Sequence, residues 1–264
     1  MSFSSAGAVF GGPGSWKAEI PPGWDIFGVT NGGFLMSIAT RAMESEADGR
    51  ELISATGTFL NPAHPGPVEV DVSTLKAGRS LSTLRARLSR NERPLVAVNA
   101  VFEDRDRPAP RQDMVNGHPP ELPPPDDCVP MEPSHDGPLP PPFAGKVEIR
   151  SHPVDIAAMA GDQTGGALMR GWFRLRDGEP LDAHSVVVAC DGLAPAIFNS
   201  PYPAGWTPTI ELTVQVRHPR PRGWLACRFA TRFVTNGMLE EDGEIWDEDG
   251  GLVALSRQLA LVPR

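Results

Sequence analysis

The chain has 264 residues, a formal net charge of -9 and a pI near 5.2. This acidic balance, without a run of Lys and Arg, argues against nucleic acid as a partner. Three widely spaced cysteines, Cys128, Cys190 and Cys227, form no CxxC pair and fit reduced thiols better than a disulfide framework or a zinc site. No apolar run reaches the roughly 20 residues that span a bilayer, so we expect a cytoplasmic protein with no membrane attachment.

A Pro-rich tract separates two patterned parts of the chain. Proline lacks the backbone donor and fixes φ, so segments such as PPELPPPDD exclude helix and central strand. An SH3-type ligand is one reading of such a tract, but its position between two patterned segments favours a connector. We therefore predict an N-terminal unit at residues 1–107, a linker at 108–145 and a C-terminal unit at 146–264.

The first unit opens with residues typical of loops, followed by Asn31-Gly32-Gly33 and an apolar repeat at helical spacing from Phe34 onward. Gly32 and Gly33 would let the backbone approach a ligand, with free amides at the helix N-terminus facing an anion or a polarised carbonyl. Downstream, apolar and polar residues alternate with period two, which predicts antiparallel strands. These segments are 68–75, 82–90 and 95–104, and an earlier strand is predicted at about 53–60.

The second unit repeats this order. A strand at 167–176 precedes an apolar helix at 181–199, and strands follow at 209–219, 224–234 and 252–262. The parallels indicate an internal repeat of roughly 110 residues, each with one long helix and an antiparallel sheet. The predicted fold class is therefore α+β, with a buried helix in each repeat wrapped by its sheet.

The segment 181–199 is apolar on every face, yet it contains Asp191. A carboxylate in such surroundings must be paired, hydrogen-bonded or neutralised, and such acids are often functional. Asp191 could also simply accept a bond from a nearby backbone amide. The segment by itself leaves both readings open.

Two more polar residues lie on core-like strands. Thr209 shares one face of its strand with Glu211 and Thr213, and such a face is by default exposed to solvent. Gln258 lies on a strand that is apolar on both faces, so its amide must find partners. With Asp191, these residues give three hydrogen-bonding groups that could converge.

Motif elimination narrows the chemistry. The sequence has no GxSxG, HExxH, GxxxxGK[ST] or strand-linked GxGxxG, which leaves serine hydrolases, zincins, P-loop proteins and Rossmann enzymes without support. No two histidines lie three or four residues apart. We therefore expect neither a metal site nor a cofactor.

Several segments together resemble a known family. They are GVTNGGFLMSIATRAM, ATGTFLNP and VAVNAVFED in the first half, and ACDGLAPAIF, TIELTVQVRHP and VALSRQLALV in the second. In this order and spacing the chain resembles the type II (TesB-like) acyl-CoA thioesterases, whose fold is a double hot-dog of two tandem units. The resemblance covers nearly the whole chain apart from the Pro-rich tract.

The resemblance implies hydrolysis of an acyl-CoA to a free acid and CoA. The family uses an Asp, a Ser or Thr, and a Gln to hold and activate a water, and these positions fall on Asp191, Thr209 and Gln258. Thiolate is a good leaving group, so a base-activated water and an oxyanion donor suffice without a covalent nucleophile. Amides around Gly32 and Gly33 are the predicted substrate-binding and oxyanion donors. A homodimer of double hot-dog units is the expected assembly.

Some positions depart from the family's pattern. Glu211-Leu212 stands where the family often has Asp-His, and Thr56 where a histidine can occur, which puts the acyl-chain preference in question. One alternative is a hot-dog enoyl-CoA hydratase or dehydratase, but its Asp and His a few residues apart at the helix start are not matched by Asp182 and His184. Another is an acyl-thioester binding protein without turnover.

Overall fold

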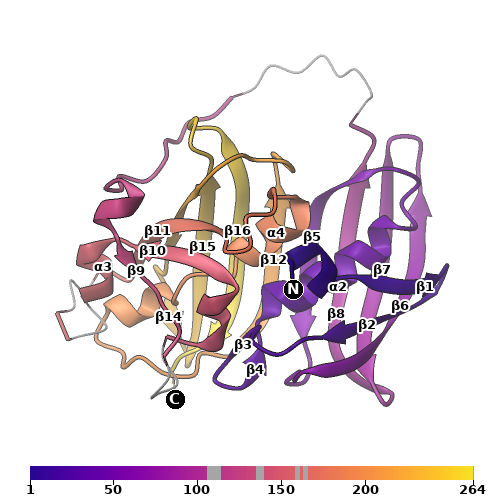
Figure 1. The fold of residues 1–264 in the computed structure, drawn as a ribbon, viewed down its shortest axis with the longest axis horizontal. Coiled ribbons are helices and arrows are strands. Elements are labelled where there is room, and N and C mark those ends of the chain that lie inside the picture. Colours follow the sequence, from indigo (N-terminus) through magenta and orange to yellow (C-terminus); the bar gives the residue numbers. More distant parts are fainter. Residues whose placement is uncertain (106–113, 135–139, 158–160, 163–165, 264) are drawn as a thin grey trace.

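The computed structural model describes residues 1–105, 114–134, 140–157, 161–162 and 166–263. Its main feature is one large antiparallel sheet to which both halves of the chain contribute (Figure 1). The first half contributes β1 (Val9–Gly12), β2 (Ser15–Ile20), β5 (Glu51–Phe59), β6 (Gly66–Ala77), β7 (Leu81–Arg90) and β8 (Arg93–Glu103). The second half contributes β9 (Val129–Pro130), β10 (Val147–Ser151), β11 (Leu168–Leu175), β12 (Thr209–Val216), β13 (Leu225–Ala230), β14 (Val234–Thr235), β15 (Met238–Trp246) and β16 (Leu252–Leu261). A separate hairpin joins β3 (Asp25–Ile26) and β4 (Val29–Thr30).

Strand order repeats from the centre of the sheet outward. In the first half the order is β5, β8, β7, β6, β2 and β1, and in the second half it is β12, β16, β15, β13, β11 and β10, with β9 at the outer edge. Strands β5 and β12 join the halves in the middle (Figure 1). The predicted repetition of elements is therefore present, and the predicted strands of both halves lie within a few residues of the observed ones.

The join between the halves is nearly symmetric. Thr56 of β5 lies opposite Thr213 of β12, and their hydroxyl oxygens are 2.9 Å apart. On either side of this pair, Glu211 faces Thr58 and Gln215 faces Ser54. An approximate two-fold axis thus passes between the two threonines.

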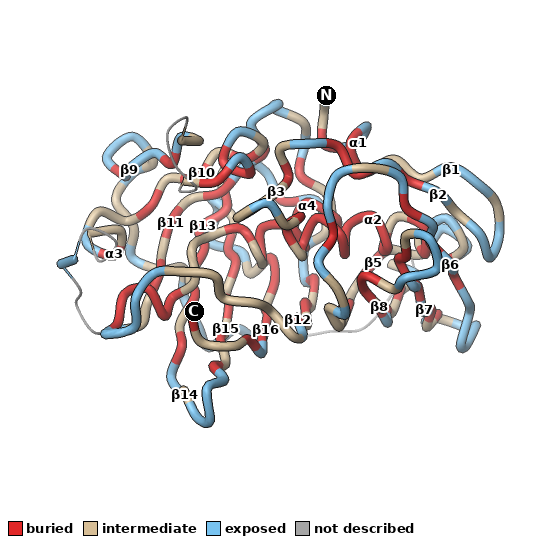
Figure 2. The backbone as a smooth tube through the Cα atoms, turned by 90° about the horizontal axis from the view of Figure 1, so that it is seen from below, coloured by how far each residue is buried: buried red, intermediate tan, exposed pale blue. Residues whose placement is uncertain are grey.

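Two central helices, α2 (Gly32–Glu44) and α4 (Ala183–Ala189), pack against each other on one side of the sheet (Figure 2). All seven residues of α4 are buried, which explains why this segment has no polar face. Gly33 allows the close approach, since a Cβ there would lie 2.9 Å from the carbonyl oxygen of Val187. Among the described residues, no helix is long and apolar enough to cross a membrane.

The predicted helix at 181–199 was too long. Helix α4 ends at Ala189, with Cys190 at its C-cap, and a turn leads to a separate 3-10 helix, η4 (Ala196–Asn199). Gly192 and Pro195 explain the break, because glycine weakens a helix and proline removes a backbone donor. Asp191 therefore lies in a turn just beyond the helix and not within it.

The sequence predicted a loop at the N-terminus, and this prediction was wrong. The first residues form α1 (Phe3–Ala6) and then strands β1 and β2, which extend the sheet by pairing with each other and with β6. Strand β10 was also missed. These segments are short, and their pairing with distant strands decides their structure more than their own pattern does.

Part of the predicted linker packs against the second half. It includes two 3-10 turns, η1 (Pro125–Asp127) and η2 (Pro142–Gly145), and strand β9 pairs with β10. Trp172 of β11 donates from Nε1 to the carbonyl oxygen of Pro123 at 2.8 Å. Residues 108–113 and 135–139 of the predicted linker lie outside the described residues, and the boundaries 108 and 145 stay a prediction. A short helix, α3 (Pro153–Ala157), follows β10.

Candidate active site

A cavity of about 300 Å³ lies between the N-terminus of α2, the turn after α4 and the inner face of β12, β16 and β15. Its lining is mainly apolar. The polar side chains that face it include Asn31, Asp191, Thr209, Glu241 and Gln258. Such a pocket, apolar with a few convergent polar groups, is the usual form of a small-molecule site.

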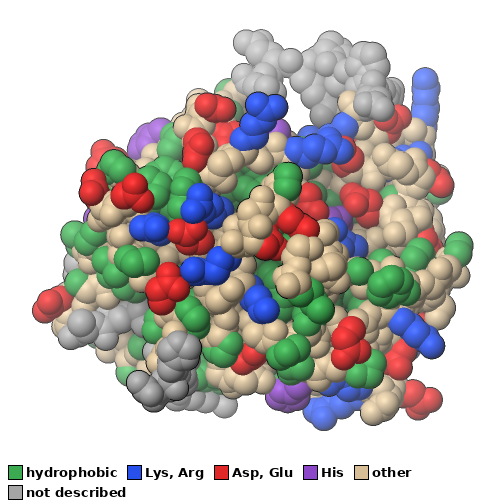
Figure 3. Space-filling model, viewed as in Figure 1, with side chains coloured by type: hydrophobic (Ala, Val, Ile, Leu, Met, Phe, Trp, Pro, Cys, Tyr) green, Lys and Arg blue, Asp and Glu red, His purple; other side chains and the backbone are tan. Residues whose placement is uncertain are grey.

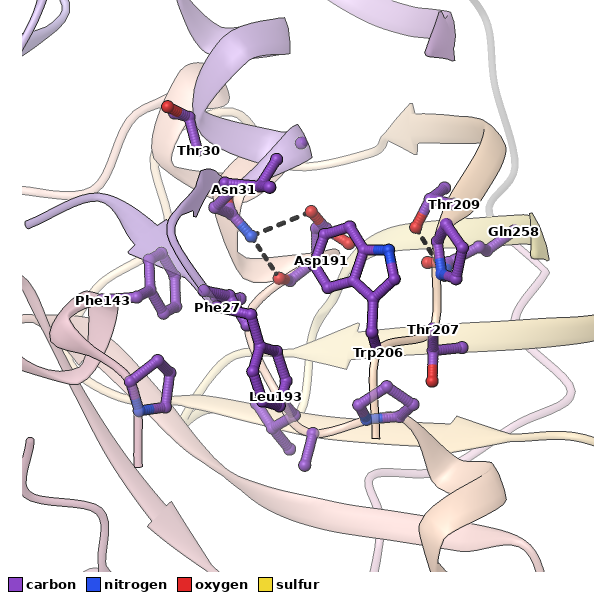
Figure 4. A pocket seen from close by; sticks show the side chains of 18 of the residues that line it. Phe27, Thr30, Asn31, Phe143, Asp191, Leu193, Trp206, Thr207, Thr209 and Gln258 are labelled. Atoms are coloured by element: carbon purple, nitrogen blue, oxygen red, sulfur yellow. Dashed lines mark hydrogen bonds between the residues drawn. The ribbon is translucent and has the colours of Figure 1, made fainter. Parts of the chain in front are cut away.

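Asp191 is held by the first half of the chain. Its Oδ2 accepts hydrogen bonds from Asn31 Nδ2 and from the Gly33 N–H, both at 2.9 Å, and Asn31 Nδ2 also donates to the Asp191 carbonyl oxygen at 2.8 Å (Figure 4). Both of these side-chain bonds are made to Oδ2. The carboxylate is thus oriented through this oxygen, and Oδ1 can face a ligand or water.

The surroundings of Asp191 favour its protonated form. Burial raises the pKa of this carboxyl from 3.8 to about 6, and the amides of Gly33 and Gly32 and the Asn31 side chain oppose part of that rise. At neutral pH the group is mostly ionised, yet it holds a proton far more readily than an ordinary aspartate. That is the property required of a general base.

The two glycines have different positions. Gly32 lines the cavity, whereas the Gly33 N–H is occupied by the Asp191 carboxylate. A Cβ at Gly32 would meet the Phe59 ring at 2.7 Å and Asp191 Oδ2 at 3.1 Å, so this position also has no room for a side chain. Their substrate-binding role stays a prediction.

Thr209 faces the cavity because of a β-bulge. The register between β12 and β16 shifts between Thr209 and Glu211, so that Thr209 pairs with Ala260. Without the extra residue, Thr209 would lie on the outer face with Glu211 and Thr213, as the alternation in the sequence predicts; that prediction was wrong. The bulge turns Thr209 to the inner face, where Ala260 is fully buried.

Thr209 and Gln258 form a pair. Gln258 is 7% exposed, and its Nε2 donates to Thr209 Oγ1 at 2.9 Å (Figure 4). The partner expected for this buried amide is therefore present. Since Thr209 Oγ1 accepts this bond, its own hydrogen is left to donate to a ligand, and Gln258 Oε1 remains an acceptor. Asp191 lies on the same cavity, although no direct hydrogen bond joins it to either residue among the described atoms.

Sequence reasoning missed two residues of this site. Asn31 was quoted only as part of a glycine turn, but it caps α2 by accepting from the Phe34 N–H and it also binds Asp191. Glu241 is a buried acid on β15, directly opposite Gln258. In the sequence, Glu241 alternates with Leu239 and Ile245 on one face of a strand, and these apolar neighbours were the signal that could have identified it.

Glu241 also has an unusual environment. Its Oε2 accepts a hydrogen bond from the Ala196 N–H at 2.6 Å. Burial raises the pKa of this carboxyl from 4.5 to about 7; the Ala196 amide lowers it, and the nearby Asp191 and Glu240 raise it further. The cavity therefore contains two acids that titrate near neutral pH.

Aromatic side chains flank the cavity on the side of the β3–β4 hairpin. Phe27, at the tip of that hairpin, meets Trp206 edge to face, with ring centroids 6.1 Å apart (Figure 4). Trp206 belongs to the segment that leads from η4 into β12. This pair makes one wall of the cavity apolar.

The described residues can also be characterised by their metal-binding side chains and by their surface charges. No group of three or more His, Cys, Asp or Glu side chains with metal-binding geometry occurs among them. On the face seen in Figure 3, acidic and basic side chains are interspersed.

Comparison with known proteins gives a consistent result. A family model of the acyl-CoA thioesterase N-terminal domain matches residues 20–103, and one of the C-terminal domain matches residues 125–262. An uncharacterized protein of Mycobacterium tuberculosis is 24% identical over 94% of this chain and 91% of its own length.

Solved structures agree. A Thermobifida fusca protein designated a candidate thioesterase II is 30% identical, with a TM-score of 0.87 over 99% of this chain and 97% of that one. A conserved Alicyclobacillus acidocaldarius protein with a hot-dog fold has a TM-score of 0.84 at 19% identity, covering 99% of this chain and 98% of its own. The acyl-CoA thioesterase II TesB2 of Mycobacterium marinum has a TM-score of 0.73 at 18% identity, with 99% and 98% covered.

Proposed function

Because the chain belongs to the type II acyl-CoA thioesterase family and is a thioester hydrolase with a hot-dog fold, we propose that it hydrolyses an acyl-CoA through a water activated by Asp191. One observation carries this proposal. Asp191, fixed through Oδ2 by Asn31 and Gly33, lines the same cavity as the hydrogen-bonded pair of Thr209 and Gln258.

The proposed roles follow from the donors and acceptors. Asp191 accepts the proton of the attacking water through Oδ1, because Asn31 and Gly33 bind Oδ2. Thr209 and Gln258 orient that water, since the threonine hydrogen and the glutamine Oε1 remain available. The tetrahedral intermediate collapses with loss of the CoA thiolate, so no covalent enzyme intermediate is required.

The two glycines take separate parts in this mechanism. We assign the Gly33 amide to holding Asp191, because its N–H already donates to Oδ2. The Gly32 amide also stabilises the Asp191 carboxylate, and because Gly32 lines the cavity its backbone would lie against the thioester. Oxyanion stabilisation needs a preorganised donor about 3 Å from the developing charge.

We further infer that the two halves are tandem hot-dog units, forming a double hot-dog within one chain. The support is the repeated strand order, one central helix in each half, and the near-symmetric pairing of β5 with β12. Association of two such chains into a homodimer is a separate prediction. Light scattering after size exclusion would test it by giving the mass of the particle in solution.

The test of the reaction is release of free thiol from a panel of acyl-CoAs of different chain length. The panel is given to the wild type, to Asp191→Asn and to Glu211→Gln, a control on the exposed face of β12. Loss of a general base lowers the rate on the order of a hundredfold or more, and we expect this for Asp191→Asn. Glu211→Gln should match the wild type.

Two outcomes would contradict the proposal. Full turnover by Asp191→Asn would make Asp191 a structural acid and end the mechanism. Equilibrium binding of every acyl-CoA in the panel without thiol release by the wild type would instead favour an acyl-thioester binding protein.

A further inference from the structure

Glu241 lies next to the Thr209–Gln258 pair, on the following strand of the sheet, and the three residues form a row that we call the polar row. Thr209, Gln258 and Glu241 face the same cavity from three adjacent strands, β12, β16 and β15. Glu241 and Gln258 are direct partners in the antiparallel register. Because neighbouring strands lie about 4.8 Å apart, the Glu241 carboxyl lies beside the reacting groups and not at a remote end of the cavity.

The bonding of Glu241 is incomplete. The residue is 7% exposed, and its Oε2 accepts from the Ala196 N–H. Among the described residues, neither a salt bridge to this carboxyl nor a hydrogen bond to its Oε1 occurs. The same cavity is also lined by the apolar side chains of Leu193, Phe198 and Phe229. A buried acid in an apolar wall is costly unless something hydrogen-bonds to it.

We propose that Glu241 is a specificity-determining residue that hydrogen-bonds a hydroxyl group on the acyl chain, so that the preferred substrates are hydroxyacyl thioesters. This rests on the proposed thioesterase function and specifies its substrate class. The juxtaposition with Gln258 places the recognised hydroxyl on the carbons next to the thioester carbonyl.

A hydroxyl matches this carboxyl in either protonation state. With a pKa raised by burial to about 7, Glu241 is present as both acid and carboxylate near neutral pH. A hydroxyl can donate to the carboxylate and accept from the acid. An unsubstituted chain would leave Oε1 without a partner, and an acyl chain bearing its own carboxylate would be repelled by Asp191 and Glu241 together.

A purely structural role gives a different expectation. Through Ala196, Glu241 ties the turn that carries Asp191 to the sheet. If that were its only function, its replacement would lower the turnover of hydroxylated and unsubstituted substrates by the same factor. The ratio between the two substrates therefore separates recognition from positioning.

The experiment measures kcat/KM by thiol release for acyl-CoAs of equal length, unsubstituted or with a hydroxyl at C2 or C3. The enzymes are the wild type, Glu241→Leu, Glu241→Gln, and the control Glu244→Gln, which lies on the outer face of the same strand. We expect the wild type to prefer one hydroxylated substrate by about tenfold or more, as for a site that hydrogen-bonds its substrate. Glu241→Leu should abolish that preference, Glu241→Gln should retain part of it, and the control should keep it.

The proposal is overturned if the wild type does not prefer a hydroxylated substrate, or if Glu241→Leu keeps the wild-type ratio. Should Glu241→Leu not fold, an unchanged ratio in Glu241→Gln would equally overturn it. If the wild type hydrolyses none of these thioesters, the proposed reaction fails. Dissociation constants for the same substrate pairs would then decide the role of Glu241 separately.

Discussion

The approximate two-fold axis relates two places at which a site could lie. In the part of the chain that the structure describes, the place beside Asp191 is an apolar cavity, and its counterpart beside Asp182 is lined by charged groups. Counting outward from the Thr56–Thr213 pair, both central strands have a bulge near their first residues, and the registers then match strand for strand. The polar row of the second half corresponds to buried apolar residues in the first. Thr209 corresponds to Leu52, Gln258 to Ala100 and Glu241 to Leu84.

The residues that cap the two helices also have different partners. Asn31 caps α2 and binds Asp191 beyond the end of α4, whereas Asp182 caps α4 and forms an ion pair with Arg41 near the end of α2, at 3.0 Å. Around that ion pair lies a cavity of about 120 Å³, lined by charged groups that include Glu44, Glu51 and Arg220, most of which pair with one another. In each half, a residue near the start of the helix therefore contacts the other half, Asn31 by a hydrogen bond to Asp191 and Asp182 by an ion pair with Arg41. Of these two acids, Asp191 faces the apolar cavity.

The largest expected effect that distinguishes the two places is the pH dependence of turnover. The base must be ionised, so kcat/KM should fall about tenfold per pH unit below the Asp191 pKa of about 6, or about a hundredfold between a plateau at pH 8 and pH 4. Rates are measured where circular dichroism shows the folded protein. A profile that stays flat to pH 4 would contradict Asp191 as base.

The next effect concerns the polar row. Thr209→Val and Gln258→Leu should each lower kcat by about ten- to a hundredfold, because each removes a group that orients the water. The double variant should lose less than the product of the two factors, since both residues act through one hydrogen bond. Thr56→Val, on the two-fold axis, is the matched control. If it lost as much activity as Thr209→Val, the two places could not be told apart.

A smaller effect is on stability. The folded pKa of Asp191, about 6, exceeds its ordinary value of 3.8, so the folded state binds this proton more tightly than the unfolded state does. The free energy of unfolding therefore falls as pH rises from about 4 to about 6. Asp191→Asn should raise it by up to about 3 kcal/mol at pH 8 and leave it nearly unchanged at pH 4, because two pKa units are worth that much.

Denaturant titration of the wild type and Asp191→Asn at pH 4 and pH 8 measures these free energies of unfolding. Thr40→Val, in the first half of the chain, is the comparison variant. Thr40 Oγ1 lies 2.9 Å from His184 Nδ1, and loss of this buried bond should cost about 1 kcal/mol at pH 8. Lower stability of Asp191→Asn at pH 8 would show that the ionised carboxylate stabilises the fold.

The smallest effect is expected at the ion pair between Asp182 and Arg41. Asp182→Asn keeps a good N-cap but removes the charge that faces Arg41. The Asp182 side chain is 39% exposed. A partly exposed pair of this kind is worth about 1 kcal/mol or less. We expect that small loss in thermal stability with kcat/KM unchanged, and a drop in turnover would argue against two independent places.

Periodicity predicted much of the fold. The alternating segments became β5 to β8 and β12, β13 and β16, and the apolar spacing after Asn31 became α2. Such signals are strong where one face of a long element is buried. The short strands β1, β2 and β10 were missed, because they are defined by the strands they pair with.

The sequence singled out three of the polar residues that line the cavity, but it did not predict their arrangement. Asp191 and Gln258 stood out because polar groups in apolar segments need partners. The bulge that turns Thr209 inward adds a single residue to the strand, and alternation gives no sign of it. The contact between Asn31 and Asp191 spans 160 positions along the chain, so local pattern could not reveal it.

The threonine pair on the axis has a consequence for how this asymmetry could arise. Two identical subunits meeting there would have to duplicate every substitution, so that a Leu at position 52 would also fill the place of Thr209. Within one polypeptide, each half can change alone. The covalent connection thus frees one half to become packing and ion pairs, while the other keeps the cavity and the acids that face it.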